Sequence, residues 1–200
     1  MPTALPEILP ELPPLVPPRK RWTRAECALI EGTGVLAEQH VELVQGELID
    51  KMGKNRPHGI ALALLMGWLI DVFGRRFVQQ EVSIDVAPDE NPTNEPEPDA
   101  IVLGRDLTTV VSNPLPSELR LVVEVADSTL SFDLTTKAGL YARAGIVEYW
   151  VIDVVGKRLI AHREPANGNY HSITAFGENE SVAPIAALEH SLHVGDVFPQ

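Results

Sequence analysis

The sequence predicts one α/β domain in which helices flank a mixed β-sheet. Its 200 residues, 44% of them hydrophobic and 22% charged, are enough for one globular domain with a substantial core. Segments with the alternating or continuous apolar pattern of strands are interspersed with segments of helical periodicity. Along the chain the order is α-β-β-α-β-β-β-α-β-β-β without an internal repeat, which is the order expected of a single mixed sheet.

The N-terminal residues 1–18 are expected to form a disordered tail ahead of a domain that spans residues 19–200. Prolines recur through this segment and favour extended conformations that do not contribute to a core. A partner-binding arm is the alternative interpretation of the same prolines. After the tail, Thr23 and Glu26 form the pattern of a capping box, which predicts a short helix that continues to about Ile30.

A hairpin and a long helix follow. Residues 41–50 have the pattern of a β-hairpin that turns at Gln45 and Gly46. Residues 58–73 are apolar on almost every side, which predicts a buried helix. The longest apolar run within it, residues 60–70, is far shorter than the ~20 residues that a membrane-spanning helix needs.

The remaining chain is predicted to supply most of the sheet. Residues 88–98 are expected to be a loop because they contain four prolines and four acidic residues. A second helix is predicted from about Ser131 to Ala144, and a hairpin is expected across Asn167 and Gly168. Apolar or alternating patterns predict the strands, which are residues 77–86, 99–104, 119–126, 147–154, 158–164 and 170–176.

Charge and cysteine content restrict the function classes. The net charge of −12 argues against broad affinity for nucleic acids, because phosphate binding depends on clustered lysine and arginine. A local basic cluster, more typical of a solvated edge than of a binding surface, consists of Arg19, Lys20, Arg21 and Arg24. The single cysteine, Cys27, excludes an intrachain disulfide. With no secretory signal and no membrane segment, the protein is expected to be soluble and cytoplasmic.

The most informative residue is Glu124, which lies within the apolar strand of residues 119–126. Alternation divides this strand into two faces, with Leu119, Leu121, Val123 and Val125 on one and Val122, Glu124 and Ala126 on the other. A strand that is apolar on both faces is expected to be central and buried. An isolated carboxylate is costly there, so Glu124 needs a metal, a cationic partner or a raised pKa.

Asp99 is the first candidate for completing a site with Glu124. It follows a proline at the start of another apolar strand, where an aspartate on its own would commonly form a turn. Together, Asp99 and Glu124 could converge on one divalent cation, because hard oxygen ligands suit Mg²⁺ or Mn²⁺. Carboxylates and a lysine around such a cation are the groups that support hydrolysis of phosphodiester bonds.

Lys137 is the candidate lysine, since it falls on the apolar side of its predicted helix. At 100° per residue, it lies between Tyr141 and Ala144 on that side. This placement predicts a lysine that points toward the sheet bearing Glu124. The alternative is a lysine that extends to solvent or pairs with Asp133, one turn earlier.

Together these residues resemble the Uma-two family of restriction endonucleases, which belongs to the PD-(D/E)XK nuclease superfamily. The resemblance covers about residues 22–195 and is carried by VELVQGELI, EPDAIVLG, LVVEVADST and YARAGIVEYWVID together with His58, Asp133 and Lys137. It implies a restriction-endonuclease-like fold and metal-dependent hydrolysis of DNA. Asp99 and Glu124 would match the metal-binding acids, and Lys137 would match a catalytic lysine on the following helix.

The resemblance adds further candidate residues. Glu42 and Glu47 resemble the acids of the family's first motif, and Glu42 is preferred as a third metal ligand because it lies inside its strand. For Glu47 the alternative is a solvated acid of the hairpin. His58 is a candidate for contacting phosphate or acting as a base, but a helix-start histidine bonded to the backbone is expected instead. Asp133 is expected to favour the N-terminus of its helix or to steady Lys137.

The leading hypothesis is a Mg²⁺- or Mn²⁺-dependent endonuclease acting on DNA. With an acidic chain, this requires an unusual substrate, a partner that supplies affinity, or a homodimer that concentrates basic patches. A catalytically inactive binding or regulatory protein with the nuclease fold is the alternative, because Ala126 stands where the superfamily usually has its lysine. A third hypothesis is a structural dimer in which Glu124 simply pairs with Lys137, so that removing divalent ions leaves stability unchanged.

Overall fold

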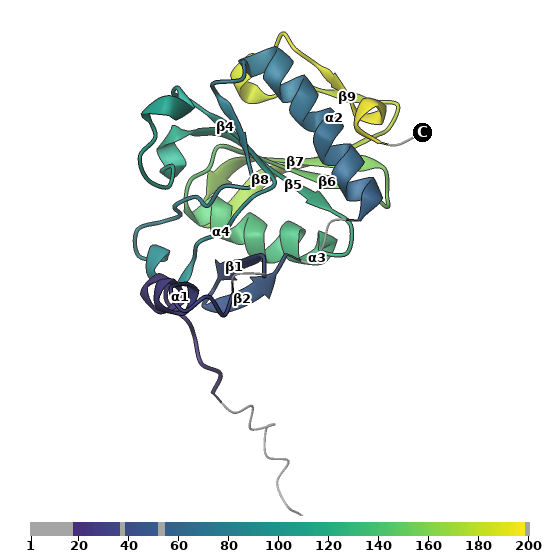
Figure 1. Ribbon diagram of the computed structural model, residues 1–200. Helices are drawn as coiled ribbons and strands as arrows, with labels where there is room; N and C mark the ends of the chain where they lie inside the picture. Colours follow the sequence, from purple (N-terminus) through teal and green to yellow (C-terminus); the bar gives the residue numbers. More distant parts are fainter. Residues whose placement is uncertain (1–17, 37–38, 52–54, 199–200) are drawn as a thin grey trace, which may run out of the picture.

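The computed structural model describes residues 18–36, 39–51 and 55–198, so the tail predicted for residues 1–18 lies outside the described residues apart from Pro18 (Figure 1). Within this part of the chain, a six-stranded sheet has the order β3-β4-β5-β6-β7-β8. The β5–β6 pair is parallel and the other pairs are antiparallel, which confirms a mixed sheet. The strands are β3 (Val78–Gln80), β4 (Ala100–Leu103), β5 (Leu119–Ala126), β6 (Glu148–Asp153), β7 (Arg158–Ala166) and β8 (Asn169–Gly177).

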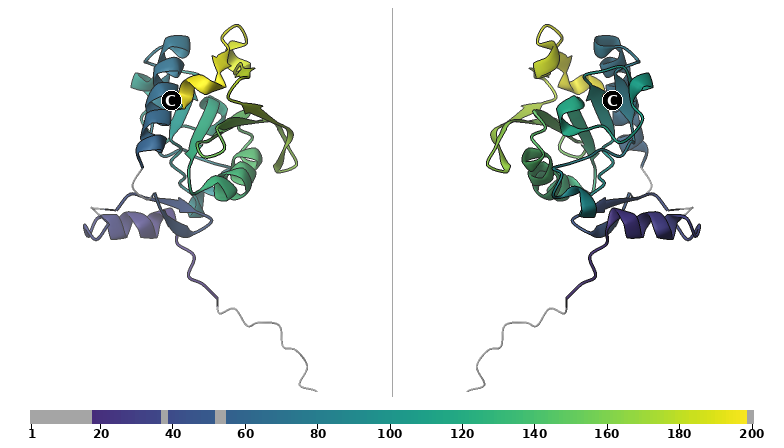
Figure 2. Two further views of the ribbon diagram at one scale, coloured as in Figure 1. Left: turned by 90° about the vertical axis from the view of Figure 1, so that its right-hand side faces the viewer. Right: turned by 90° about the vertical axis from the view of Figure 1, so that its left-hand side faces the viewer.

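Helices cover both faces of the sheet (Figures 1 and 2). α2 (Arg56–Phe73) packs on one face, and α3 (Leu130–Phe132) with α4 (Ala138–Arg143) packs on the other. The strand residues in the core with α2 include Leu121, Val123 and Trp150, and those in the core with α4 include Val122, Tyr149 and Val151. Strands β5 and β6 are therefore buried on both faces, as the apolar pattern of residues 119–126 predicts.

Short elements surround these layers. The predicted capping box starts α1 (Arg24–Glu31), since the Thr23 hydroxyl accepts from the N–H of Glu26 and the Glu26 carboxylate accepts from the N–H of Thr23. Other short elements are β9 (Ser181–Val182), β10 (Leu192–His193) and 3₁₀ turns at Asn91–Thr93, Leu107–Thr109, Pro116–Glu118, Ile185–Ala187 and Val194–Val197.

Both predicted hairpin turns are confirmed. β1 (Val41–Val44) and β2 (Glu47–Asp50) form a separate two-stranded sheet that turns at residues 45–46, where the φ angles are 51° and 74°. The turn between β7 and β8 at residues 167–168 has φ angles of 52° and 76°. Positive φ at both central positions suits a tight hairpin turn and favours Asn and Gly. The first hairpin lies beneath α3 and α4, where it can contribute residues to a site (Figure 1).

The strand predicted for residues 77–86 is shorter than its alternation indicates. β3 ends at Gln80, and Glu81 has a positive φ of 50°, which turns the backbone away from the extended conformation. Beyond this point, the N–H of Ile84 donates to the carbonyl of Pro96 in the loop that precedes β4. The alternating pattern thus continues past the residue at which backbone geometry ends the strand.

The helix predicted from Ser131 to Ala144 is interrupted by a π-helical turn. Residues Asp133–Lys137 form this turn between α3 and α4. The N–H of Ala138 donates to the carbonyl of Asp133, one residue farther back than in an α-helix. The extra residue changes which side chains share a face, and π turns inside helices occur frequently at functional sites.

A β-bulge changes the face on which Leu119 lies. The register between β4 and β5 shifts at Arg120, so Leu119 packs in the core cluster of Val122 and not in that of Leu121. The predicted face of Leu119 is therefore wrong, because simple alternation assumes an uninterrupted ladder. Glu124 lies beyond the bulge and keeps the face that alternation predicts.

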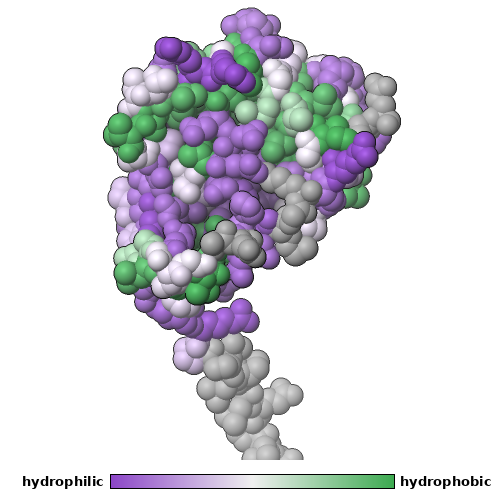
Figure 3. Space-filling view, viewed as in Figure 1, coloured by the Kyte–Doolittle hydropathy of each residue, from purple (hydrophilic) through white to green (hydrophobic). Residues whose placement is uncertain are grey.

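α2 is buried on one side only, so the prediction of a helix buried all round is wrong. Its core-facing residues are His58, Ala61, Leu62, Leu65 and Leu69. On the outer side Leu64 is 44% exposed, and hydrophobic residues gather over α2 in Figure 3. Within the described ranges, α2 is the helix whose length and hydropathy would suffice for a bilayer, with mean hydropathy 1.2 over 18 residues and 28% of that window buried. This criterion concerns length and composition alone.

His162 on β7 makes the fold sensitive to acid. Its ring is buried between Tyr149 and Tyr170, with ring centroids 5.3 and 5.6 Å away. Burial lowers the pKa of His162 below its ordinary value of 6.5. At His162 the unfolded chain therefore binds a proton at a higher pH than the folded protein does, so the contribution of His162 to stability is retained above about pH 6.5 and declines as the pH falls below it.

Replacing His162 with phenylalanine is expected to remove this loss of stability at acid pH. The measurement is the free energy of unfolding by urea at pH 7 and pH 5 for the wild type and for His162→Phe. His190→Gln is the control, because the side chain of His190 is half exposed. Equal losses between pH 7 and pH 5 in the wild type and His162→Phe would contradict the assignment.

Candidate active site

The sheet brings Asp99 and Glu124 together. Ala100 pairs with Val123, so continuing the register by one residue places Asp99 opposite Glu124 on the face covered by α3 and α4. The N–H of Val125 donates to Asp99 Oδ2 at 2.8 Å, which holds the aspartate against β5. Both carboxylates are buried, with 4% and 3% exposure, and both line a cavity of about 420 Å³.

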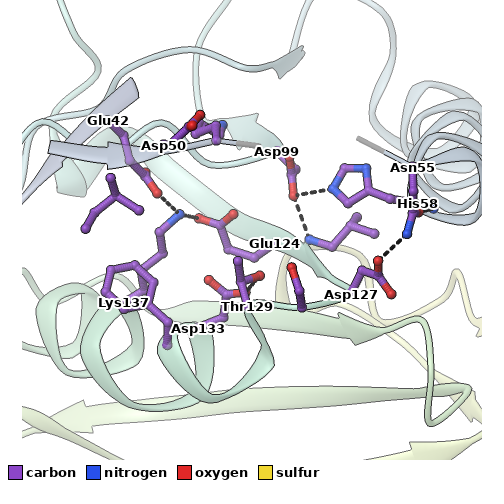
Figure 4. Close-up of a pocket in the computed structure, with 15 residues that line it drawn as sticks. Glu42, Asp50, Asn55, His58, Asp99, Glu124, Asp127, Thr129, Asp133 and Lys137 are labelled. Atoms are coloured by element: carbon purple, nitrogen blue, oxygen red, sulfur yellow. Dashed lines mark hydrogen bonds and ion pairs between the residues drawn. The ribbon is translucent and has the colours of Figure 1, made fainter. Parts of the chain in front are cut away.

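The cavity lies between the hairpin β1–β2, the start of α2, the end of β5 and the π-helical turn (Figure 4). Six acidic side chains face two lysines and one histidine in its wall. The acids are Glu42, Asp50, Asp99, Glu124, Asp127 and Asp133, and the basic residues are Lys51, His58 and Lys137. The excess of negative charge favours a cation in this cavity.

The structure brings Lys137 to Glu124, as the helical periodicity predicts. The Lys137 Nζ lies 2.8 Å from Glu124 Oε1 and 2.8 Å from Glu42 Oε1 (Figure 4). With 2% exposure, Lys137 does not extend to solvent. Its two ion pairs are with Glu42 and Glu124, while Asp133 contributes to it electrostatically from the π-helical turn.

Burial dominates the protonation of this cluster. It raises the pKa of Glu124 from its ordinary 4.5 to about 8, an effect that Lys137 opposes and Asp99 reinforces. Burial on its own lowers the pKa of Lys137, but the nearby carboxylates of Glu124 and Glu42 reverse this effect and raise it. Lys137 is therefore an ammonium at neutral pH, whereas a proton competes for Glu124.

Glu42 is held on two sides. Its Oε1 pairs with Lys137, and its Oε2 accepts a hydrogen bond of 3.0 Å from the N–H of Glu97. Glu42 thereby links the hairpin β1–β2 to the cavity. Glu47 lies at the surface, where it pairs with Arg19 and Arg21, in agreement with a solvated acid of the hairpin.

His58 contacts a candidate residue instead of the backbone. Its Nε2 lies 3.3 Å from Asp99 Oδ2, and its Nδ1 is buried without a hydrogen-bond partner among the described residues. Asn55 caps α2 by accepting from the N–H of His58 at 3.0 Å, and its side chain also donates to Asp127. The expectation that the His58 ring bonds to the backbone is wrong, because the start of α2 directs the ring at Asp99.

Asp133 and Tyr141 complete the surroundings of the ion pair. The Thr129 hydroxyl donates to Asp133 Oδ2 at 2.6 Å, and burial raises the pKa of Asp133. The Tyr141 hydroxyl donates to Glu124 Oε1 at 3.0 Å. The sequence predicts Tyr141 only as part of the apolar side of its helix. Its spacing of four residues from Lys137 is the signal that places both on one helix face.

The donor set fits a hard divalent cation. Within the described ranges, no group of three or more His, Cys, Asp or Glu side chains is placed to hold a metal ion. Mg²⁺, however, is usually bound through one or two carboxylates, with water and substrate phosphate completing its coordination. Two buried carboxylates, Asp99 and Glu124, meet that requirement in a cavity that favours a cation.

The basic cluster near the start of the domain is neutralised by acids. Arg19 and Arg21 pair with Glu47, while Lys20 lies 2.6 Å from Glu26. The fourth member, Arg24, pairs with Asp85 at 2.6 Å. These pairs agree with a solvated edge and leave little uncompensated positive charge for a nucleic-acid backbone.

Comparisons with known proteins identify the family and support the fold. Residues 30–195 match the family model Uma2, described as "Putative restriction endonuclease". A crystal structure of "a putative nuclease belonging to DUF820" from Anabaena variabilis superposes with a TM-score of 0.62 at 16% identity, covering 80% of this chain and 90% of that chain. No curated protein matches. Because the family model spans most of the chain, the protein belongs to the Uma2 family.

Proposed function

We propose that this protein is a divalent-metal-dependent endonuclease that hydrolyses phosphodiester bonds in DNA. The observation that carries the proposal is the buried ammonium of Lys137, held 2.8 Å from Glu124 in the cavity that also contains Asp99. Ion pairs buried to this extent are costly to assemble and cluster at functional sites. Membership of the Uma2 family supports a nuclease activity.

Asp99 and Glu124 are the residues proposed to hold Mg²⁺ or Mn²⁺. When bound, such a metal polarises a phosphoryl oxygen and lowers the pKa of a bound water. Lys137 is proposed to orient the attacking water or to stabilise negative charge in the transition state. Its ammonium has three donor hydrogens, and the described ion pairs with Glu42 and Glu124 account for two.

Glu42 and His58 are proposed to support these residues. Glu42, predicted from the sequence as a third ligand, is better placed to hold Lys137, because one of its oxygens pairs with that ammonium and the other accepts from the N–H of Glu97. His58 supports Asp99 by contacting its Oδ2. Asp133 adds negative charge that keeps Lys137 protonated.

The affinity for DNA is proposed to arise inside the cavity. The net charge of −12 and the neutralised basic cluster provide little long-range attraction for phosphate. A metal and the Lys137 ammonium would supply the local positive charge. A homodimer that combines two such sites is proposed to increase binding to duplex DNA.

Calorimetric titration with Mn²⁺ tests the proposal without knowledge of the cleaved sequence. The wild type is expected to bind Mn²⁺ saturably, while Glu124→Ala and the isosteric Glu124→Gln lose this binding. Asp99→Asn should weaken it at least about tenfold, since it removes one of two charged ligands. Glu189→Ala is the control, because the Glu189 side chain is 74% exposed. Folded wild-type protein that binds no Mn²⁺ would contradict the proposal.

The same wild-type and variant proteins distinguish an active endonuclease from a catalytically inactive member of the family. Ala126, fully buried at the position of the superfamily's usual lysine, favours this alternative. If Mn²⁺ binds but plasmid and single-stranded DNA both remain intact, the chain is a metal-binding module without turnover. Cleavage that requires Mn²⁺ or Mg²⁺ and is lost in Glu124→Gln supports the endonuclease.

A further inference from the structure

We infer that Tyr141 is a positioning residue that orients the Glu124 carboxylate toward the metal, an inference that rests on the proposed function. Two donors converge on one oxygen of Glu124. Lys137 Nζ lies 2.8 Å from Oε1, and the Tyr141 hydroxyl donates to the same Oε1 at 3.0 Å. The two hydrogen bonds therefore hold the Glu124 carboxylate through one of its two oxygens.

The local helix geometry explains why both donors reach Glu124. Lys137 is the last residue of the π-helical turn, and Tyr141 lies in α4 one turn later. Side chains four residues apart project from the same face of a helix. The ammonium and the phenol therefore approach Glu124 from the helix side of β5, and neither depends on a loop for its position.

The second oxygen of Glu124 points toward Asp99 (Figure 4). The hydrogen bonds that Glu124 accepts within the described residues both end on Oε1. Both Glu124 and Asp99 line the cavity. Because Lys137 and Tyr141 bind Oε1, the other oxygen, Oε2, is directed at the side of the cavity where Asp99 lies. A metal shared by the two acids would then meet a carboxylate that is already oriented.

Tyr141 is itself rigidly held. It is fully buried, its ring packs edge-on against Tyr149 with centroids 5.0 Å apart, and it is not in the wall of the cavity. A tyrosine hydroxyl carries its proton at neutral pH, and the hydroxyl of Tyr141 donates it to the hydrogen bond with Glu124. A phenylalanine would fill the same space in the core, which separates the role of the hydroxyl from that of the ring.

The test is the Mn²⁺ dissociation constant of Tyr141→Phe, measured by calorimetry. Outer residues that orient metal ligands typically contribute 10–100-fold to metal affinity, so Tyr141→Phe is expected to bind Mn²⁺ about 10–100-fold more weakly than the wild type. Tyr170→Phe is the matched control. Tyr170 is also buried and its hydroxyl donates to the carbonyl of Ile146 at 2.9 Å, away from the site.

The outcomes separate this inference from the proposed function. If the wild type binds no Mn²⁺, the proposed function fails and the inference fails with it. If the wild type binds Mn²⁺ and Tyr141→Phe binds it equally well, only the inference is overturned. Equal weakening in Tyr141→Phe and Tyr170→Phe, or a Tyr141→Phe variant that does not fold, would assign the hydroxyl a structural role and also overturn it.

Discussion

Replacing Lys137 with methionine is expected to lower the free energy of unfolding by about 3–5 kcal/mol. The substitution keeps the length and much of the volume of the side chain but removes the positive charge. Glu42 and Glu124, with 5% and 3% exposure, are then left buried without their shared counter-ion. A carboxylate buried without a counter-ion costs free energy, and Glu124 loses the ammonium that opposes the rise of its pKa. Urea denaturation at pH 7 measures the loss.

Lys157→Met is the matched control for this experiment. Lys157 also pairs with a glutamate, Glu178, at 3.5 Å, but its side chain is 52% exposed. An exposed ion pair of this kind contributes less than about 1 kcal/mol. If Lys137→Met is as stable as Lys157→Met, the ion pairs of Lys137 with Glu42 and Glu124 do not stabilise the fold.

Adding Mn²⁺ to Lys137→Met distinguishes a metal site from a purely structural ion pair. A divalent cation that binds the folded protein restores stability by mass action, and the effect grows with its concentration. Recovery with Mn²⁺ and loss of that recovery with chelator are expected if Asp99 and Glu124 form a metal site. A variant that stays equally unstable with and without Mn²⁺ would support the hypothesis that Glu124 and Lys137 only pair within the core.

The sequence predicts the central part of this site because the relevant signals are local. Glu124 interrupts an apolar strand and Lys137 interrupts the apolar side of a helix, so each is conspicuous within its own segment. The helical segment that follows β5 then packs on the face of the sheet that bears Glu124, which brings Lys137 to it. The two local patterns are therefore sufficient to predict that these side chains lie close together.

Other features depend on geometry that no local pattern contains. Tyr141 resembles a core residue in the sequence, since a tyrosine ring packs like any apolar ring and its hydroxyl is informative only beside Glu124. The positive φ of Glu81 ends β3 within an unbroken alternating pattern. Likewise, the bulge at Arg120 moves Leu119 to the other face without altering the composition of the strand.

The affinity for Mn²⁺ is expected to rise at least about tenfold from pH 6 to pH 8, because the metal must displace a proton from Glu124. Burial raises the pKa of Glu124 from 4.5 to about 8 in the metal-free protein. A larger fraction of the molecules therefore has an ionised Glu124 at pH 8 than at pH 6. Calorimetry in two buffers with different ionisation enthalpies measures both the affinity and the proton released.

The contribution of Glu124 to the stability of the metal-free protein should change in the opposite direction. A carboxyl whose pKa is raised on folding stabilises the folded state below its unfolded pKa of 4.5, and this contribution is lost as the pH rises toward about 8. Glu124→Gln is the control, since the amide keeps the shape of the side chain but does not titrate. Mn²⁺ affinity that is constant from pH 6 to pH 8, with no proton released on binding, would show that the metal does not bind through Glu124. If a proton and a metal compete for this one carboxylate, the Mn²⁺ affinity therefore rises with pH, while the contribution of Glu124 to the stability of the metal-free protein falls.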